Sequence, residues 1–292
     1  MIDVLLPFYG DPDLMRLAVL SVLEQDTTGW RLVVVDDHYP DEVIGAWLTS
    51  LGRSDVVYVR NQQTLGVNGN FRRALSLATS EHVVFLGCDD LLGPGYISAM
   101  RRALGQHPDA AIVSPGVEVI DGQGRASEPL VDRVKRRLRP RADVPVVLSG
   151  EDALVSLLTG NWTYFPSLCW RRDLITSIGF RPGYGVVLDL GLLVDVLVAG
   201  GDLLVIDDRL FMYRRHPASE SSAKTALGAR FEEERHYFDA IAAELERRGL
   251  QRAARAARAH LTSRLHAAAL VPANVRRRDS AAVARLLRHA IR

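Results

Sequence analysis

The chain has 292 residues, of which 48% are hydrophobic and 24% are charged. These values are typical of a soluble globular protein with one large α/β domain or two small ones. The formal net charge is only +1, so the overall charge gives no reason to expect a nucleic-acid partner.

The two cysteines, Cys88 and Cys169, are too few for a disulfide framework or a zinc site. We therefore expect a reducing, cytoplasmic location. No basic region precedes the first apolar run, so a signal peptide is not expected. The most apolar stretch, residues 186–206, contains three aspartates and is a poor membrane span, so any membrane contact would be peripheral, at the inner face.

The first 115 residues alternate between strand and helix patterns. Strands are predicted at residues 3–7, 31–35, 56–60, 83–86 and 110–114, and helices at 12–25, 42–51, 68–78 and 95–105. The strands lack apolar–polar alternation, which favours a mostly parallel sheet flanked by helices on both faces. Right-handed crossovers would then bring the carboxyl ends of all strands to one edge of an α/β fold.

The second half is less regular. Residues 125–148 are charged and contain proline, which predicts a loop over the edge of the sheet. Helices are predicted at 150–158, with Ser149 as the N-cap, and at 190–199, and short strands at 203–206 and 210–213. The predicted divisions of the chain are residues 1–115, residues 116–222 and a helical extension, residues 223–292. The extension could dock on the catalytic domain, form a homodimer or lie on an anionic membrane through its basic cluster at residues 276–278.

Two adjacent acids, Asp89 and Asp90, follow the predicted strand at residues 83–86. Ligands of open α/β folds bind at the carboxyl ends of the strands. Two oxygen donors there suit Mg²⁺ or Mn²⁺ bound to a diphosphate. The alternative is a solvated acid pair that opens a turn, which the glycine and proline at residues 93–95 would allow.

A second acid pair, Asp36 and Asp37, ends another predicted strand, and could accept a base N–H or a ribose hydroxyl or simply start a turn. Residues 61–70 form a loop rich in glycine and asparagine that leads into a helix, with N–H groups available for a phosphate or a sugar. The turn after the first strand, residues 7–10, lacks the dinucleotide fingerprint, and the chain contains no P-loop. These absences argue against an NAD oxidoreductase and a P-loop NTPase.

The set of motifs resembles the family 2 glycosyltransferases. The matching segments are Leu5-Leu6-Pro7-Phe8-Tyr9, Ser21-Val22-Leu23-Glu24-Gln25, Val34-Val35-Asp36-Asp37, Asn61 with Leu65-Gly66-Val67-Asn68-Gly69-Asn70, and Phe85-Leu86-Gly87-Cys88-Asp89-Asp90. The resemblance implies a GT-A fold, a nucleoside diphosphate sugar as donor and a divalent metal. The family usually has an acid where this chain has Gly87 or Cys88, so the metal would depend on Asp90, with Asp89 nearer the donor.

The resemblance also implies roles for individual residues. Donor binding would involve Pro7, Phe8, Tyr9, Asp36, Asp37, Asn61, Gly66, Asn70, Asp89 and Arg214, and the metal would be held by Asp90 and His216. Asp189 stands where the family has its general base, although Leu188 replaces the preceding glutamate. A first-turn acid favoured by the helix dipole is the alternative for Asp189, and Asp195 is a competing base.

The acceptor side is less informative. Trp162 and Tyr164 have rings suited to stacking on a sugar, or to core packing. The expected function is metal-assisted, inverting transfer of a sugar to a hydroxyl of a glycan, glycolipid or small molecule, and the resemblance favours UDP as the nucleotide of the donor. The alternatives are a degenerate GT-A protein that only binds, and a sugar nucleotidyltransferase, which would need a cation after the first strand that residues 7–11 lack.

Overall fold

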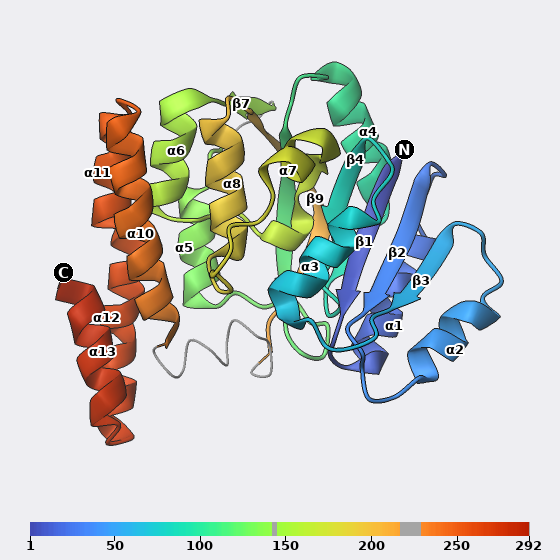
Figure 1. Cartoon of the computed structure of the whole chain (residues 1–292), viewed down its shortest axis with the longest axis horizontal. Helices are drawn as coiled ribbons and strands as arrows, with labels where there is room; N and C mark the ends of the chain where they lie inside the picture. The colour runs from blue at the N-terminus through green and yellow to red at the C-terminus, as the bar shows by residue number, and fades with distance from the viewer. Residues whose placement is uncertain (142–144, 217–228, 292) are drawn as a thin grey trace.

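The computed structural model describes residues 1–141, 145–216 and 229–291 (Figure 1). One nine-stranded sheet has the strand order β3-β2-β1-β4-β8-β6-β9-β5, and β7 also pairs with β9. The strands are β1 (Ile2–Phe8), β2 (Trp30–Asp36), β3 (Val56–Arg60), β4 (His82–Phe85), β5 (Leu91–Leu92), β6 (Ile112–Ile120), β7 (Val146–Leu148), β8 (Cys169–Arg171) and β9 (Leu203–Arg214).

Helices cover both faces of the sheet. In the first half they are α1 (Pro12–Leu23), α2 (Val43–Ser50), α3 (Gly66–Ser76) and α4 (Tyr96–Gln106). In the second half they are α5 (Leu130–Leu138), α6 (Gly150–Thr159), α7 (Arg172–Ile178) and α8 (Leu188–Val198), followed by α10 (Ala229–Arg247), α11 (Gln251–Ala259), α12 (Leu261–Arg276) and α13 (Ser280–Ile291). The α/β class, the flanking helices and the helical extension are confirmed.

The sheet is mostly parallel, as predicted, with antiparallel strands in its centre and beside β9. Strands β3, β2, β1 and β4 are parallel to one another, and β6 is parallel to β9. Strand β8 runs antiparallel between β4 and β6, and the short strands β5 and β7 run antiparallel to β9. The expectation that every strand ends at one edge is therefore wrong for β8, β5 and β7.

Two further expectations are corrected. The region predicted as a loop, residues 125–148, contains α5 and β7; α5 is strongly charged on one side, which hid its periodicity. The two short strands predicted at 203–206 and 210–213 are one strand, β9, whose register against β6 shifts around Gly116. The exposed acids Asp207 and Asp208 lie at this irregularity, so they do not end the strand.

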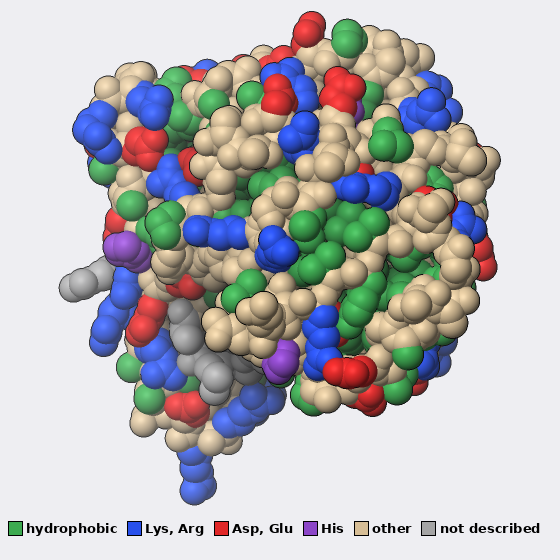
Figure 2. All heavy atoms as spheres, turned by 45° about the vertical axis from the view of Figure 1, so that its right-hand side comes forward, with side chains coloured by type: hydrophobic (Ala, Val, Ile, Leu, Met, Phe, Trp, Pro, Cys, Tyr) green, Lys and Arg blue, Asp and Glu red, His purple; other side chains and the backbone are tan. Residues whose placement is uncertain are grey.

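Two hydrophobic cores lie on opposite faces of the sheet. One contains side chains of α1, α2 and α4, and the other contains those of α3, α6, α7, α8, α10 and α11. The first two helices of the extension thus pack into the main body, whereas α12 and α13 share a small cluster with Phe231 (Figure 1). On the face that Figure 2 presents, hydrophobic side chains occupy hollows whose borders carry Lys and Arg.

Candidate functional site

The acid pair after β4 forms a tight turn in which a glycine is required. An added Cβ at Gly87 would lie 2.5 Å from Oδ2 of Asp90 and 3.2 Å from Oδ1 of Asp89. Both carboxylates therefore approach the same side of Gly87. Burial, and then the charge of Asp89, hold the pKa of Asp90 well above its ordinary value. A cation near this pair would relieve the repulsion between the two acids.

The end of β9 binds this turn. The backbone N–H of Arg214 donates to Oδ1 of Asp90 at 2.8 Å, and its Nε donates to the carbonyl oxygen of Asp89 at 2.7 Å. Its Nη1 donates to the carbonyl of Asp121 at 3.2 Å, and the side chain is buried. Nε and Nη1 of Arg214 thus hold the turn and the loop after β6, and its expected contact with the donor stays a prediction.

His216 pairs with Asp89 and not with Asp90. Its Nε2 lies 2.9 Å from Oδ2 of Asp89, and both side chains are partly exposed, whereas Asp90 is buried. Among the described residues no group of three or more His, Cys, Asp or Glu side chains could hold a metal. The residues fit an ion such as Mg²⁺ that takes one or two protein ligands and completes its shell with phosphate oxygens and water. Of the acid turn and its partner, Asp89 and His216 are the partly exposed side chains that could hold such an ion.

Cys88 lies between the acid turn and the loop after β1. An added Cβ at Gly10 would be 3.2 Å from its Sγ. Burial, with the charges of Asp89 and Asp90, raises the pKa of the Cys88 thiol to about 12. The thiol is therefore a packing group and not a nucleophile.

Asp37, the residue after β2, binds the loop that leads into α3. Its Oδ1 accepts from Nδ2 of Asn61 and from the backbone N–H of Leu65, and its Oδ2 accepts from the N–H of Gly66. Asn61 also donates to Oδ1 of Asn70 at 3.0 Å. Four of the predicted donor-binding residues, Asp37, Asn61, Gly66 and Asn70, are thus brought together. Asp37 caps the first turn of α3, which no residue of that helix caps.

Asp36 and Phe8 are used in packing. The Asp36 carboxylate is buried and accepts from the Tyr39 N–H and the Tyr58 hydroxyl. Phe8 is buried with its ring 5.0 Å from that of Tyr39. Neither side chain is presented to a ligand, so their predicted contacts with the donor are corrected. The exposed ring at this position is that of Tyr9, which stands edge-on to Tyr39 at 5.7 Å.

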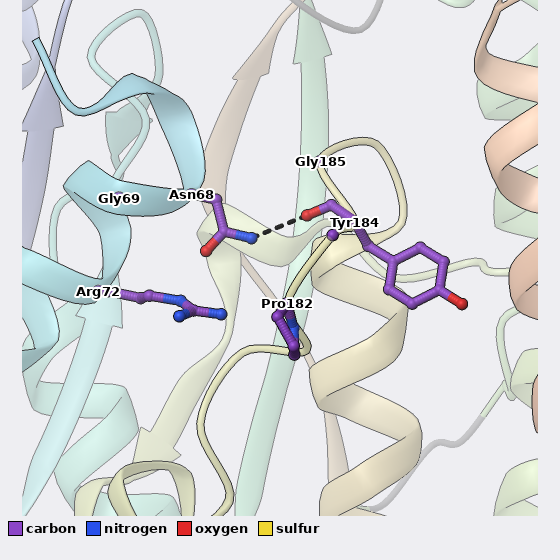
Figure 3. Close-up of a pocket in the computed structure, with 7 residues that line it drawn as sticks. Asn68, Gly69, Arg72, Pro182, Tyr184 and Gly185 are labelled. Carbon is purple, nitrogen blue, oxygen red and sulfur yellow. Dashed lines mark hydrogen bonds between the residues drawn. The ribbon is translucent and has the colours of Figure 1, made fainter.

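A cavity of about 410 Å³ separates α3 from the loop that leads to α8 (Figure 3). Its lining comprises Asn68, Gly69, Arg72, Pro182, Gly183, Tyr184 and Gly185. Nδ2 of Asn68 donates to the carbonyl of Tyr184 at 2.8 Å, while Oδ1 of Asn68 is buried without a hydrogen-bond partner in the described structure. The pocket therefore lies between α3, whose first turn Asp37 caps, and the loop that leads to Asp189.

Asp189 lies in the first turn of α8. The loop before this helix is held by α10, the first helix of the extension. One oxygen of Glu233, from α10, accepts the backbone N–H groups of Gly185, Val186 and Val187 at 2.6–2.9 Å. Burial raises the pKa of Asp189, and the Leu190 N–H and the charges of Lys135 and Arg230 oppose that rise. The carboxyl group has the environment of a general base. Asp195 is instead bound by Arg181 at 2.6 and 2.8 Å, which removes it as a competitor.

A polar cluster lies between the acid turn after β4 and the surroundings of Asp189. Asp132 accepts two hydrogen bonds from Arg215, at 2.6 and 2.7 Å, and one from the Tyr164 hydroxyl at 2.8 Å. Nζ of Lys135 donates to the carbonyl of Thr163 and lies 4.4 Å from the centre of the Tyr164 ring. Burial, and then the charge of Arg215, lower the pKa of Lys135 to about 8. Arg215 precedes His216 in the chain, so this cluster lies between the acid turn and the surroundings of Asp189.

Trp162 is a core residue. It is 1% exposed, its Nε1 donates to Ser156, and Arg139 lies over its ring. The predicted stacking on an acceptor is therefore wrong for Trp162, whereas Tyr164 remains partly exposed beside Lys135. Sequence reasoning missed Asp132, Lys135 and Glu233. The first two lie in the segment taken for a loop, and the third lies in the extension, where no motif marked it.

Known proteins are similar to this chain in sequence and in fold. The family model "Glycosyl transferase family 2" matches residues 3–148. A relative from Mycobacterium tuberculosis, uncharacterized protein MT1568, is 26% identical over 230 residues, which is 77% of this chain and 70% of its own. The uncharacterized glycosyltransferase alr2836 from Nostoc is 26% identical over 243 residues, or 78% of this chain and 71% of its own.

A solved structure of S. aureus TarS, residues 1–349 in complex with UDP-GlcNAc, superposes with a TM-score of 0.65. The alignment is 16% identical and covers 84% of this chain and 66% of that chain. This similarity shows that the two proteins share the GT-A fold. The family model covers half of the chain, and its match includes both acid pairs and the α3 loop. The chain therefore belongs to glycosyl transferase family 2.

Proposed function

We propose that this protein transfers a sugar from a nucleoside diphosphate sugar to an acceptor hydroxyl, with inversion at the anomeric carbon and Asp189 as the general base. The observation that carries the proposal is the series of polar interactions that leads from the acid turn towards Asp189. His216 binds Asp89, Arg215 binds Asp132, and the charge of Lys135, one helical turn from Asp132, lowers the pKa of Asp189. Donor and acceptor chemistry would therefore take place within one connected region.

The chain's own residues account for the separate steps. Asp37 fixes the start of α3, and Asn68 binds this helix to the loop that leads to α8. Asp189 takes the proton of the acceptor hydroxyl as that oxygen attacks the anomeric carbon, and the bond to the diphosphate breaks on the opposite side. A single displacement inverts the configuration.

Negative charge on the departing diphosphate needs compensation. Nε and Nη1 of Arg214 and Nε and Nη2 of Arg215 already donate to other groups of the protein. Asp89 and His216 would hold Mg²⁺ or Mn²⁺, which would neutralise part of that charge. We therefore assign the metal to the partly exposed Asp89, and the buried Asp90 would stabilise the turn.

A uridine donor is favoured by the TarS structure, which holds UDP-GlcNAc. We would measure thermal shifts with UDP, GDP and dTDP, each with and without Mn²⁺, because a ligand that binds only the native state raises Tm. The expected result is stabilisation by UDP that depends on Mn²⁺. An equal response to all three nucleotides would reject the assignment of uridine.

Catalysis needs its own test. Release of nucleoside diphosphate from a sugar nucleotide in the presence of acceptor would demonstrate transfer, and NMR of the new glycosidic bond would give its configuration. Retention of the donor's configuration would contradict the inverting mechanism. Nucleotide binding without turnover over a panel of donors and acceptors would favour a binding protein, and formation of a sugar nucleotide from a sugar phosphate would favour a nucleotidyltransferase.

A further inference from the structure

Helix α12 exposes an apolar stripe along its whole length. The side chains of Leu261, Leu265 and Val275 are 51%, 60% and 56% exposed, and those of Ala268 and Pro272 between them are also exposed. These positions follow the spacing i, i+4, i+7, i+11 and i+14, which places them on one side of a helix. No charged residue interrupts the stripe.

The opposite side of α12 is packed against the protein. Ala267 is buried there, Leu270 packs in the cluster formed with Phe231 of α10 and Leu286 of α13, and Ser263 donates to Glu234. The inner side of the helix is therefore covered, whereas apolar side chains exposed in a row on the outer side form an unusual surface for a helix at the edge of a protein. In the part of the chain that the structure describes, the outer side of α12 faces solvent, so its exposed stripe is a candidate contact surface.

The charge around this stripe indicates the partner. From Leu261 to Ile291 the sequence contains six arginines and a single acid, Asp279. Three of the arginines, Arg276, Arg277 and Arg278, are consecutive and exposed at the end of α12. Two copies of so basic a surface would repel each other, whereas anionic lipid headgroups would neutralise it.

A second exposed apolar side adjoins the start of α12. Leu130, Val134 and Leu138 are exposed at i, i+4 and i+8 of α5, next to the basic Arg133 and Arg137. The two helices meet at residue 160. An added Cβ at Gly160 would lie 2.7 Å from Cδ1 of Leu138 and 2.6 Å from Cγ2 of Thr262. The same pattern of apolar side chains beside arginine thus occurs on two neighbouring helices.

We propose that the outer side of α12, with the arginines at its end, binds the surface of an anionic lipid bilayer. The apolar side chains would enter the boundary between headgroups and acyl chains while the arginines contact the phosphates. No helix among the described residues has the length and hydrophobicity needed to cross a bilayer, so the contact is peripheral. This inference does not depend on the proposed reaction.

The test is sedimentation of the full-length protein with vesicles of phosphatidylcholine alone or mixed equally with phosphatidylglycerol. We expect binding to the anionic vesicles only, weakened by salt. The combined Leu261→Ser, Leu265→Ser and Val275→Ser variant should lose about tenfold or more in affinity. The Arg276→Gln and Arg277→Gln variant should lose about fivefold per arginine. If the leucine and valine variant fails to fold, the arginine variant is used to test the proposal, because its changes lie on the surface.

The matched control is Leu17→Ser with Val43→Ser, which changes similarly exposed side chains on α1 and α2, at the far end of the molecule in Figure 1. It should bind vesicles like the wild type. Equal binding to both vesicle types, or equal loss in the control, would overturn the proposal. Light scattering adds a third outcome: a dimer that the α12 variant dissociates, without vesicle binding by the wild type, would assign the stripe to a second copy.

Discussion

Nε2 of His216 lies 2.9 Å from Oδ2 of Asp89, and two residues earlier the N–H of Arg214 donates to Asp90 at 2.8 Å. One segment at the end of β9 thus binds both acids of the turn after β4, although more than 120 residues separate the two segments in the chain. The position of the acid pair therefore depends on the second half of the protein.

Replacing His216 with Ala should weaken donor binding that depends on metal. The variant loses a partner of Asp89 and a candidate ligand, and a hydrogen bond to a charged group contributes about 1.5–3 kcal/mol, so the apparent KM for the donor should rise about tenfold or more. Donor KM measured over a range of Mn²⁺ concentrations checks this. His107→Ala, at the end of α4, is the control. An unchanged KM at every Mn²⁺ concentration would remove His216 from the site.

Asp189→Asn should lower kcat by about 10²–10⁴ with little change in donor binding, because a general base acts only in the chemical step. Asp195→Asn is the matched control, since it lies on the same helix but is bound by Arg181. That variant should lose stability and keep most of its turnover per folded molecule. The reverse pattern would make Asp195 the base.

The pH dependence of kcat follows from the surroundings of Asp189. The base must be ionised, and burial raises its pKa, so activity should fall as the pH drops through a value above the ordinary 3.8 of an aspartate. Lys135 opposes that rise, so Lys135→Met should move the acidic limb to still higher pH. Profiles of kcat against pH for the two proteins test the direction, and a shift to lower pH would contradict it.

An acid at residue 87, one of the two positions where the resemblance implies that one is missing, should harm the protein. A Cβ there would lie 2.5 Å from Oδ2 of Asp90, so Gly87→Ala and Gly87→Asp should both displace the acid turn and lower metal-dependent donor binding. Gly105→Ala is the control, because its Cβ would meet nothing within 4 Å and alanine favours a helix. Tighter donor binding by Gly87→Asp would show that the turn adapts to the acid.

Glu233 positions the base without touching substrate. Glu233→Ala removes the acceptor of three N–H groups in the loop before Asp189, so kcat should fall about tenfold or more while donor KM is retained. Glu232→Ala, at the exposed neighbouring position, should behave like the wild type. Proportional losses in kcat and donor affinity would point to a general loss of structure instead of positioning.

The sequence predicted the first half of the fold well because its strands are buried on both faces and read as unbroken apolar runs. Val33 to Val35 and Val83 to Phe85 are such runs, and each is fully buried in the sheet. Glycine and asparagine in the loop before α3 likewise predicted a network of polar contacts, which Asp37, Asn61 and Asn70 form.

Elements in the second half depend on partners distant in sequence. Strand β8 has three residues and is defined by pairing with β4 and β6, and α5 is a charged helix of nine residues. The roles of single side chains were harder to predict than their locations. Arg214 and Asp36 lie where the motif requires, yet their polar atoms are used by neighbouring groups of the protein, and sequence alone does not show such competition.

The three hydrogen bonds that Glu233 accepts also affect how this protein could be re-engineered. Since α10 holds the loop that carries Asp189, a chimera that exchanges acceptor specificity should transplant α8 and α10 as one cassette. A crossover placed between them would combine a loop from one parent with an anchor from another. An exchange of donor preference should likewise move the end of β9 together with the first half, because Arg214 and His216 bind the acid turn after β4.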